Sequence, residues 1–352
     1  RSDYSIEESK VVFKFMTNRY DYEREIKWRK ELCNEDSKAV IKDDILPILS
    51  HLDPNAIDGE IDKKYAEERV GVRFKAMPLY SKDIASGQTI DLTVYPYALV
   101  FPYAAGGTMQ DSMTRGTLTP SEAKLCAYKM GLVLDELHQC GLVHGSFSPK
   151  NILAFFEGEK GEEHLKLGGL SSVTPMDQDM YKQGAISAGG KCLFDYTALT
   201  PEMFMKVNTT QLQKYNIYWQ LVREIEGVTI SEEAIKPRFD PITSETYVLK
   251  CYCNHEKAMA LNNYLPYDLA SFDRTVDVWA FGVLLFTLLS GGESLFQPNQ
   301  RTGRVTSMEL LAKWDANVAE SIVSQYIPDL AAQDLLLHIL VPKEDREKLS
   351  MK

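Results

Sequence analysis

The sequence lacks the long apolar segments and clustered cysteines that mark membrane-spanning and disulfide-stabilised proteins. Its longest apolar stretch, Val278–Leu289, is shorter than the roughly 20 residues that cross a bilayer and therefore predicts a buried helix. The six cysteines are spread over 352 residues and do not form a disulfide framework. No signal peptide is visible at the start, so we expect an intracellular protein, cytoplasmic or nuclear, without a membrane span.

Positive charge is also scarce. The chain has 39 Lys and Arg residues against 50 Asp and Glu residues, which gives a net charge of −11. This balance disfavours a partner with a phosphate backbone, so we expect no nucleic acid to bind. With 44% hydrophobic and 25% charged residues, the composition is typical of a globular protein, and the chain is long enough to bury a large core.

The stretch that organises the rest of the chain is Leu142–Leu153, which reads Leu-Val-His-Gly-Ser-Phe-Ser-Pro-Lys-Asn-Ile-Leu. Two apolar pairs flank a loop of small and polar residues. A helix should lead into this loop, because Thr119–Glu122 has a Thr cap, Pro at the first helical position and an acid in the first turn. Leu125, Tyr128 and Leu132 follow at helical spacing.

The order of His144, Pro149 and Asn151 resembles the catalytic loop of eukaryotic protein kinases, which reads His-Arg-Asp-Leu-Lys-Pro-x-Asn. Other segments resemble further motifs of that family and occur in the family's order. They are the strand Lys10–Met16 with Lys14, the helix Tyr20–Leu32 with Glu25, the strand Ala98–Phe101 with the Gly106-Gly107 turn, Gly168–Ser171, Thr200-Pro201-Glu202, Thr275–Leu285 with Asp277, and Asp345-Arg346. The shared order, rather than any single motif, carries the resemblance.

The resemblance implies an α+β, protein kinase-like fold of two lobes. Residues 1–103 would form a small β-rich N-lobe, with a further strand predicted at Val70–Phe74, and residues 104–352 a larger, mainly α-helical C-lobe. Residues 203–265 lie between two motifs that are much closer together in the family, so they predict an insertion within the C-lobe. Residues 2–9 contain no glycine, so the Gly-rich loop strands are either absent from the protein or outside this sequence.

The resemblance also implies a nucleotide site between the lobes. Lys14 and Glu25 correspond to the pair that positions ATP phosphates. Phe101 would be a bulky gatekeeper residue, and Pro102 removes one N–H donor from the adenine-facing edge, so we expect any ATP binding to be weak. Arg29 stands where the family packs an apolar residue, which puts a normally assembled helix in doubt. The remaining candidates for nucleotide contact are Val12, Tyr103, Ala104 and Leu153.

The groups that handle protons, phosphates and metal in the family are replaced here. The base Asp is Ser146, the phosphate-contacting Lys is Ser148, and the metal-binding Asp is Gly169. Loss of a general base alone typically removes a factor of about 10²–10⁴ in rate. Asn151 remains as one weak metal ligand, and because Mg²⁺ usually needs carboxylates as well, we expect no tight Mg²⁺ site.

The framework residues of the family are present. His144 belongs to the loop, and the resemblance implies that Asp277 holds the loop backbone. It also implies a structural ion pair between Glu202 and Arg346.

Two alternatives would restore chemistry to the loop. Asp177 or Asp179 could supply a metal carboxylate from a rearranged segment, and Lys150 could replace the lost Lys. Gly145 replaces the family's Arg, so phosphorylation of the following segment would have no cationic anchor there.

The inserted residues 203–265 are the candidate region for binding a protein partner. For Tyr215, Tyr218 and Trp219, on the predicted helix Leu212–Ile225, packing onto the C-lobe is favoured over a docking patch. A strand is predicted at Thr246–Cys253. Cys251, Cys253 and His255 would make half of a metal site, but no second ligand pair follows, so partly buried thiols are favoured.

The sequence therefore predicts a pseudokinase, a protein kinase-like domain that acts as a binding, scaffold or allosteric module with weak or no ATP binding and no efficient phosphoryl transfer. Two alternatives stay open. One is a divergent, active serine/threonine-type protein kinase that transfers the ATP γ-phosphate to proteins. The other is a structural fragment whose partner supplies the missing lobe. Function has to be argued from the site itself.

Overall fold

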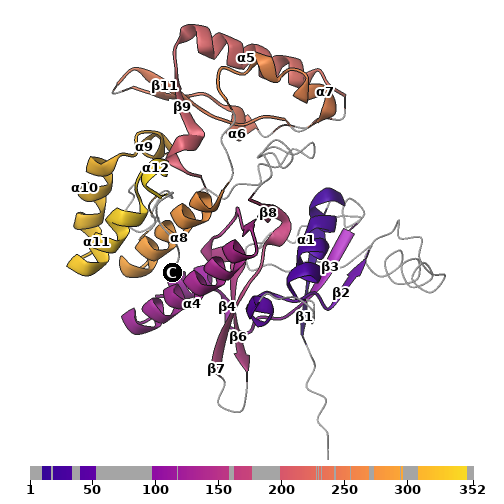
Figure 1. Cartoon of the computed structure of the whole chain (residues 1–352), viewed down its shortest axis with the longest axis vertical. Helices are drawn as coiled ribbons and strands as arrows, with labels where there is room; N and C mark the ends of the chain where they lie inside the picture. Colours follow the sequence, from indigo (N-terminus) through magenta and orange to yellow (C-terminus); the bar gives the residue numbers. More distant parts are fainter. Residues whose placement is uncertain are drawn as a thin grey trace, which may run out of the picture.

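The computed structural model of the chain combines small sheets with a larger set of helices (Figure 1). Every strand pair among the described residues is antiparallel, and helices cluster apart from the sheets, which is an α+β architecture. No helix in the described part is long and apolar enough to cross a membrane. The structure describes residues 10–16, 19–33, 40–52, 97–116, 118–157, 162–176, 199–226, 228, 230, 232–241, 243–253, 255–268, 273–293, 295 and 308–346.

The N-terminal part of the chain forms a three-stranded sheet with one helix beside it. Strand β1 (Val11–Met16) pairs with β3 (Tyr97–Pro102), which also pairs with the short β2 (Ser50–Leu52). Helix α1 (Arg19–Leu32) contacts β1 and β3. The predicted strand at Val70–Phe74 lies outside the described residues. The three residues of β2 are too few to show the alternating pattern by which strands are recognised.

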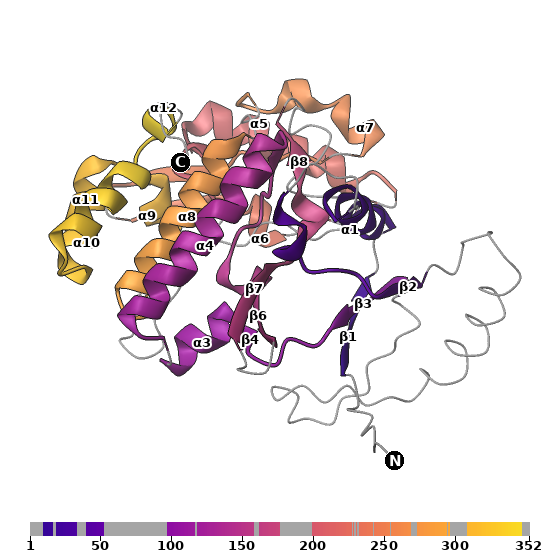
Figure 2. The same ribbon diagram turned by 60° about the horizontal axis from the view of Figure 1, so that its bottom comes forward.

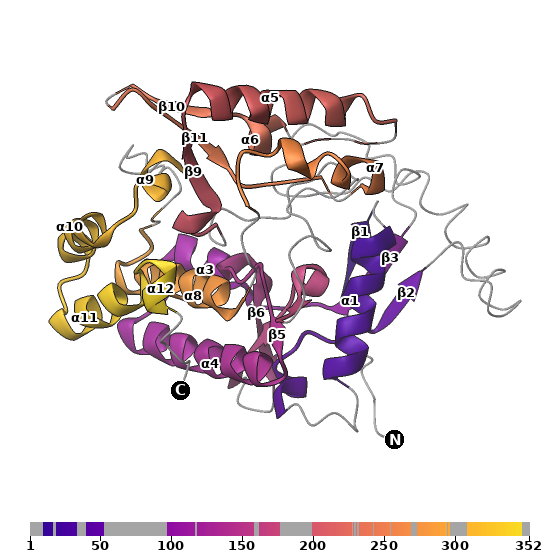
Figure 3. The ribbon, with the colours of Figure 1, turned by 45° about the horizontal axis from the view of Figure 1, so that its top comes forward.

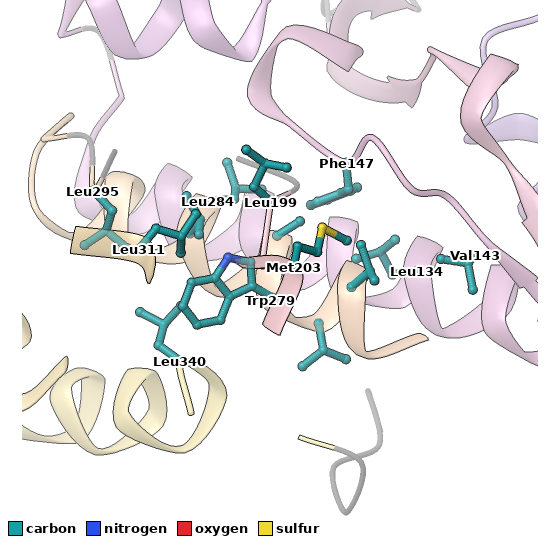
Figure 4. Close-up of a cluster of buried hydrophobic side chains, with 14 of the residues drawn as sticks. Leu134, Val143, Phe147, Leu199, Met203, Trp279, Leu284, Leu295, Leu311 and Leu340 are labelled. Carbon is teal, nitrogen blue, oxygen red and sulfur yellow. The ribbon is translucent and has the colours of Figure 1, made fainter. Parts of the chain in front are cut away.

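The helical part is built around two helices that run side by side, α4 (Pro120–Gln139) and α8 (Arg274–Leu289) (Figure 2). Trp279 of α8 is fully buried, and its ring lies perpendicular to that of Trp314 at 5.5 Å. Leu134, Met203 and Leu340 belong to the same core (Figure 4). The remaining helices are α3 (Met109–Arg115), α9 (Met308–Ala312), α10 (Ala316–Tyr326), α11 (Leu330–Ile339) and α12 (Lys343–Arg346).

The helix predicted before the loop is present, but it buries a different face from the one its large apolar residues suggested. Thr119 caps α4 in a reciprocal capping box with Glu122, as the sequence pattern predicted. Leu125, Tyr128 and Leu132 are exposed. The buried face carries Ala123, Cys126, Ala127, Met130, Gly131, Val133, Leu134 and Leu137. Its small residues allow neighbouring elements to approach closely, which large side chains would prevent.

Short strands hold the loop that follows α4. Strand β5 (Leu142–Val143) pairs with β8 (Thr174–Pro175) on one side of it. On the other side, β6 (Ile152–Glu157) forms a hairpin with β7 (Glu162–Leu167) and also pairs with β4 (Gly107–Thr108). The loop is therefore fixed at both ends.

The predicted insertion has a sheet of its own, which α5 (Thr209–Arg223) covers (Figure 3). The sheet has the order β10-β11-β9, formed by Arg238–Asp240, Glu245–Leu249 and Phe204–Val207. Two short helices, α6 (Glu232–Ile235) and α7 (Glu256–Met259), complete this part.

The three aromatic residues of α5 that the sequence singled out are buried. Tyr215, Tyr218 and Trp219 belong to the main core, so packing, the favoured alternative, is what the structure has. Cys251 and Cys253 are fully buried rather than partly buried. Strand β11 ends at Leu249, before them.

Candidate functional site

The loop between β5 and β6 is held by one buried carboxylate. Asp277 of α8 accepts hydrogen bonds from the backbone N–H groups of His144, at 2.7 Å, and Gly145, at 2.9 Å. His138 of α4 contacts the same carboxylate at 3.0 Å through its Nε2 atom. Because Asp277 lies in the first turn of a long buried helix, it ties the path of the loop to the core.

The ring of His144 links the loop to the segment after β7. Its Nδ1 atom accepts a hydrogen bond from the Ser146 N–H at 3.2 Å, so its Nε2 atom carries the proton and donates to the carbonyl of Gly168 at 2.9 Å. Burial lowers the pKa of His144, although the nearby charge of Asp277 opposes the change. The ring therefore acts as a neutral connector near pH 7.

The Asn151 side chain occupies the space in front of Gly169. Its amide nitrogen donates to the carbonyl of Ser146 at 2.8 Å and lies 3.4 Å from the Ser146 hydroxyl. Gly169 has a left-handed backbone with φ of 73°, and a Cβ atom there would lie 2.6 Å from Cγ of Asn151. No side chain fits at this position unless Asn151 or the backbone moves. The structure thus brings Ser146, Asn151 and Gly169 together, without a carboxylate among them.

Three charged side chains meet between β1 and α1. Lys14 and Arg29 both pair with the carboxylate of Glu25, which is completely buried. Arg29 also donates from Nε to the carbonyl of Leu46 at 2.8 Å, and its guanidinium lies over the ring of Phe101 at 5.0 Å. Burial alone would raise the pKa of Glu25, but the charges of Arg29 and Lys14 outweigh it and lower that pKa to about 2.

Arg29 therefore supports the helix that the sequence put in doubt. Its side chain is buried, whereas that of Lys14 is 40% exposed. Arg29 is therefore the partner of Glu25 that is shielded from solvent. The sequence did contain a signal for this contact, because opposite charges four residues apart on a helix face each other. His138, which contacts Asp277, had no comparable signal.

The other candidates for nucleotide contact divide into two groups. Phe101, Ala104 and Leu153 lie together in the smaller of the two cores, whereas Val12 and Tyr103 are exposed. The backbone around Tyr103 and Ala104 already uses part of its hydrogen-bonding capacity. The N–H of Tyr103 donates to the carbonyl of Lys10 at 3.3 Å, and the carbonyl of Ala104 accepts from Gly107 at 3.0 Å.

Glu202 and Arg346 are in contact, as the sequence comparison implied. Arg346 is fully buried, donates to the carbonyl of Val341 and lies over the ring of Trp279 at 5.0 Å. This pair fastens the residues before the insertion to the last helix. Its place in the core makes it a packing element rather than a group that could meet a ligand.

Of the four remaining sequence candidates, two lie in the described loop and two lie outside the described residues. Ser148 is buried, and its hydroxyl has no hydrogen-bond partner there. Lys150 is exposed in the short turn Pro149–Asn151. Asp177 and Asp179 lie outside the described residues.

The site offers a partly exposed cation at Lys14, which is paired with Glu25, a hydroxyl at Ser146 and an amide at Asn151. It can hold an anion by charge, but its described loop residues supply no carboxylate that could take a proton or bind a hard metal. Within the described ranges, no cluster of three or more His, Cys, Asp or Glu residues could hold a metal ion. No protein-family model matches the sequence, and no curated protein matches it.

Proposed function

We propose that the chain is a pseudokinase, a protein kinase-like domain that works as an intracellular binding or allosteric module for protein partners. The contacts Lys14–Glu25, Asp277–loop and Glu202–Arg346 support this proposal, because each joins two motifs of the kinase pattern that are distant in sequence. The small sheet would be the N-lobe, the helical part the C-lobe, and residues 203–265 the partner-binding insertion.

The observation that carries the proposed loss of activity is the contact between Asn151 and Gly169. Phosphoryl transfer needs held phosphates, a metal to neutralise charge and an oriented nucleophile. Gly169 has no side chain for the metal, and the Asn151 amide fills the space that a side chain would need. Ser146 offers only a hydroxyl where a base is needed. Efficient phosphoryl transfer is therefore not expected.

Nucleotide binding, on this proposal, is weak and independent of Mg²⁺. Lys14, which is partly exposed and paired with Glu25, is the cation that would meet a phosphate. Phe101 is buried under Arg29, so a ligand gains no extra space behind the gatekeeper position.

A divergent, active serine/threonine-type kinase is the second candidate. The ion pair between Lys14 and Glu25 favours it, because active kinases require that pair to be in place.

A thermal-shift experiment with ATP, with and without Mg²⁺, separates the two candidates. We expect a small shift that does not depend on Mg²⁺ and that is lost in Lys14→Met, together with no transfer of labelled γ-phosphate to a generic protein substrate. A shift that requires Mg²⁺, accompanied by phosphate transfer, would contradict the pseudokinase proposal.

A further inference from the structure

The inserted part of the chain contains a groove between α5 and the residues around α6. One face of α5 forms one wall, and Glu232, Ile235, Lys236 and Pro237 form the other. The open space between them measures about 680 Å³. This volume lies within the range of about 300–1,000 Å³ that ligand sites occupy. None of the described residues that line the groove belongs to the loop site.

Two side-chain bridges hold the walls of the groove together. The hydroxyl of Tyr215 on α5 donates to the carbonyl of Ile235 at 2.9 Å. Arg223, two turns further along α5, makes a two-pronged ion pair with Glu232, with N···O distances of 3.1 and 2.7 Å. Trp219 packs at 70° to the ring of Tyr215 and stiffens the floor. A groove whose walls are already ordered loses less conformational entropy when a ligand binds.

Two carboxamides on the rim are unused. Asn216 and Gln220 are exposed, lie one helical turn apart and line the groove. Neither makes a hydrogen bond to any described residue. Each carboxamide offers both a donor and an acceptor, and an extended peptide presents N–H and C=O groups in the same combination. The rim therefore suits a main chain laid along α5.

The described charged residues that line the groove differ in sign from the chain as a whole. Arg223 is neutralised by Glu232, whereas Lys236 is exposed and has no ion-pair partner in the described ranges. Among the described lining residues, Arg223 and Lys236 are cationic and Glu232 is acidic, whereas the whole chain has a net charge of −11. A single cation is too little for a nucleic acid backbone, but it is sufficient to select an acidic side chain.

We propose that this groove binds a short, extended and acidic peptide segment of a partner protein. The carboxamides of Asn216 and Gln220 take its main chain, and Lys236 takes its carboxylate. This inference rests on the proposed role as a binding module and gives that role a site and a ligand class.

The test selects linear peptides from a random displayed library on the full chain. Binding of one selected peptide, labelled with fluorescein, is then measured by anisotropy. We expect Asp and Glu to be enriched among the selected peptides, and we expect Lys236→Glu to weaken binding by about tenfold, since attraction becomes repulsion. The double variant Asn216→Ala/Gln220→Ala should also weaken it. The matched control is Lys214→Glu, which makes the same charge change on an exposed part of α5 outside the groove and should alter binding less than about twofold.

The proposal is overturned if the library yields no binder, or if the selected peptide binds Lys236→Glu as tightly as wild type. Thermal-shift and phosphate-transfer measurements on the same preparation keep this outcome separate from the fate of the pseudokinase proposal. If no peptide binds, the proposal of a peptide-binding groove is wrong, but the evidence from the loop for a pseudokinase is unaffected. If Mg²⁺-dependent phosphate transfer is observed, the pseudokinase proposal is wrong. Peptide binding that depends on Lys236 would still support the groove proposal in that case.

Discussion

Two buried carboxylates, Asp277 and Glu25, hold opposite sides of the candidate site, and they do so by different means. Asp277 is surrounded by the backbone N–H groups of His144 and Gly145 and by the ring of His138. Glu25 is paired with two cations, Lys14 and Arg29. Both side chains are completely buried. Asp277 fixes the position of a backbone, whereas Glu25 fixes the relation between a strand and a helix.

The difference indicates which side of the site tolerates change. A carboxylate bound by backbone donors cannot be replaced without leaving those donors unsatisfied. A carboxylate held by two cations keeps one of them when the other is removed, so the cost depends on whether the lost cation was the buried Arg29 or the partly exposed Lys14. We therefore expect the loop side to be rigid and the Lys14 side to be adjustable.

The largest effect is expected from Asp277→Ala. Three donors would lose a charged acceptor, each such bond contributing about 1.5–3 kcal/mol, and allowing for non-additivity we expect the free energy of unfolding to fall by roughly 5 kcal/mol. Urea unfolding measures this change. Asp334→Ala on α11, where the side chain is 77% exposed, is the control and should change stability by less than about 0.5 kcal/mol. A loss below about 1 kcal/mol for Asp277→Ala would contradict the conclusion that this carboxylate holds the loop backbone.

Arg29→Met and Lys14→Met should differ strongly although they remove charge from the same carboxylate. Arg29 is buried, so its loss should cost roughly 3–5 kcal/mol of unfolding free energy, as for one partner of a buried pair. Lys14 is 40% exposed and screened by solvent, so its loss should cost less than about 1 kcal/mol. Urea unfolding of both variants in one buffer is the measurement. Equal losses of unfolding free energy would show that the two cations contribute equally to the stabilisation of the Glu25 carboxylate.

Introducing a carboxylate at position 169, on the loop side of the site, should destabilise the protein. Gly169→Asp must accept a left-handed backbone and displace the Asn151 amide. Gly141 has the same φ of 73° with nothing within 4 Å of an added Cβ, so Gly141→Asp is the matched control. We expect Gly169→Asp to be less stable than the control variant by roughly 1–3 kcal/mol. Even combined with Ser146→Asp, it should not create a Mg²⁺-dependent thermal shift with ATP. Such a shift would show that the loop adapts.

The smallest effect is expected from pH. The pKa of His144 is lowered by burial, so its contribution to stability is complete above its ordinary value of 6.5 and is lost as the pH falls below it. Asp277, Glu25 and Arg29 are the charged groups that act on this ring. Glu25 loses its own contribution only between about 4.5 and about 2, which is a separate window.

His144→Phe should therefore flatten the pH dependence of unfolding. Between about pH 7.5 and about pH 5.5 the wild type should lose up to about 1.4 kcal/mol more than the variant. Denaturant unfolding at both pH values measures the difference, and His164→Phe, at an exposed position on β7, serves as control. A slope unchanged by His144→Phe would show that another group titrates in this range.

Much of the local structure could be predicted from the sequence, and the exceptions share a cause. The cap at Thr119 and the helices α1, α4, α5 and α8 were predicted from local sequence patterns, which act over a few positions. The buried face of α4 was not predicted, because Leu125, Tyr128 and Leu132 form an exposed apolar stripe at helical spacing that competes with the buried stripe of small and large apolar residues. Strand β2 was too short to be recognised.

The sequence by itself determined which chemical groups the loop contains, and that neither position 146 nor position 169 carries a carboxylate. Only the tertiary structure decided that Asn151 fills the space before Gly169, that Arg29 supports Glu25 rather than disturbing it, and that α5 and α6 leave a groove between them. The reason is physical. Spacing along the chain sets local conformation, whereas the partner of a side chain depends on how elements distant in sequence pack together.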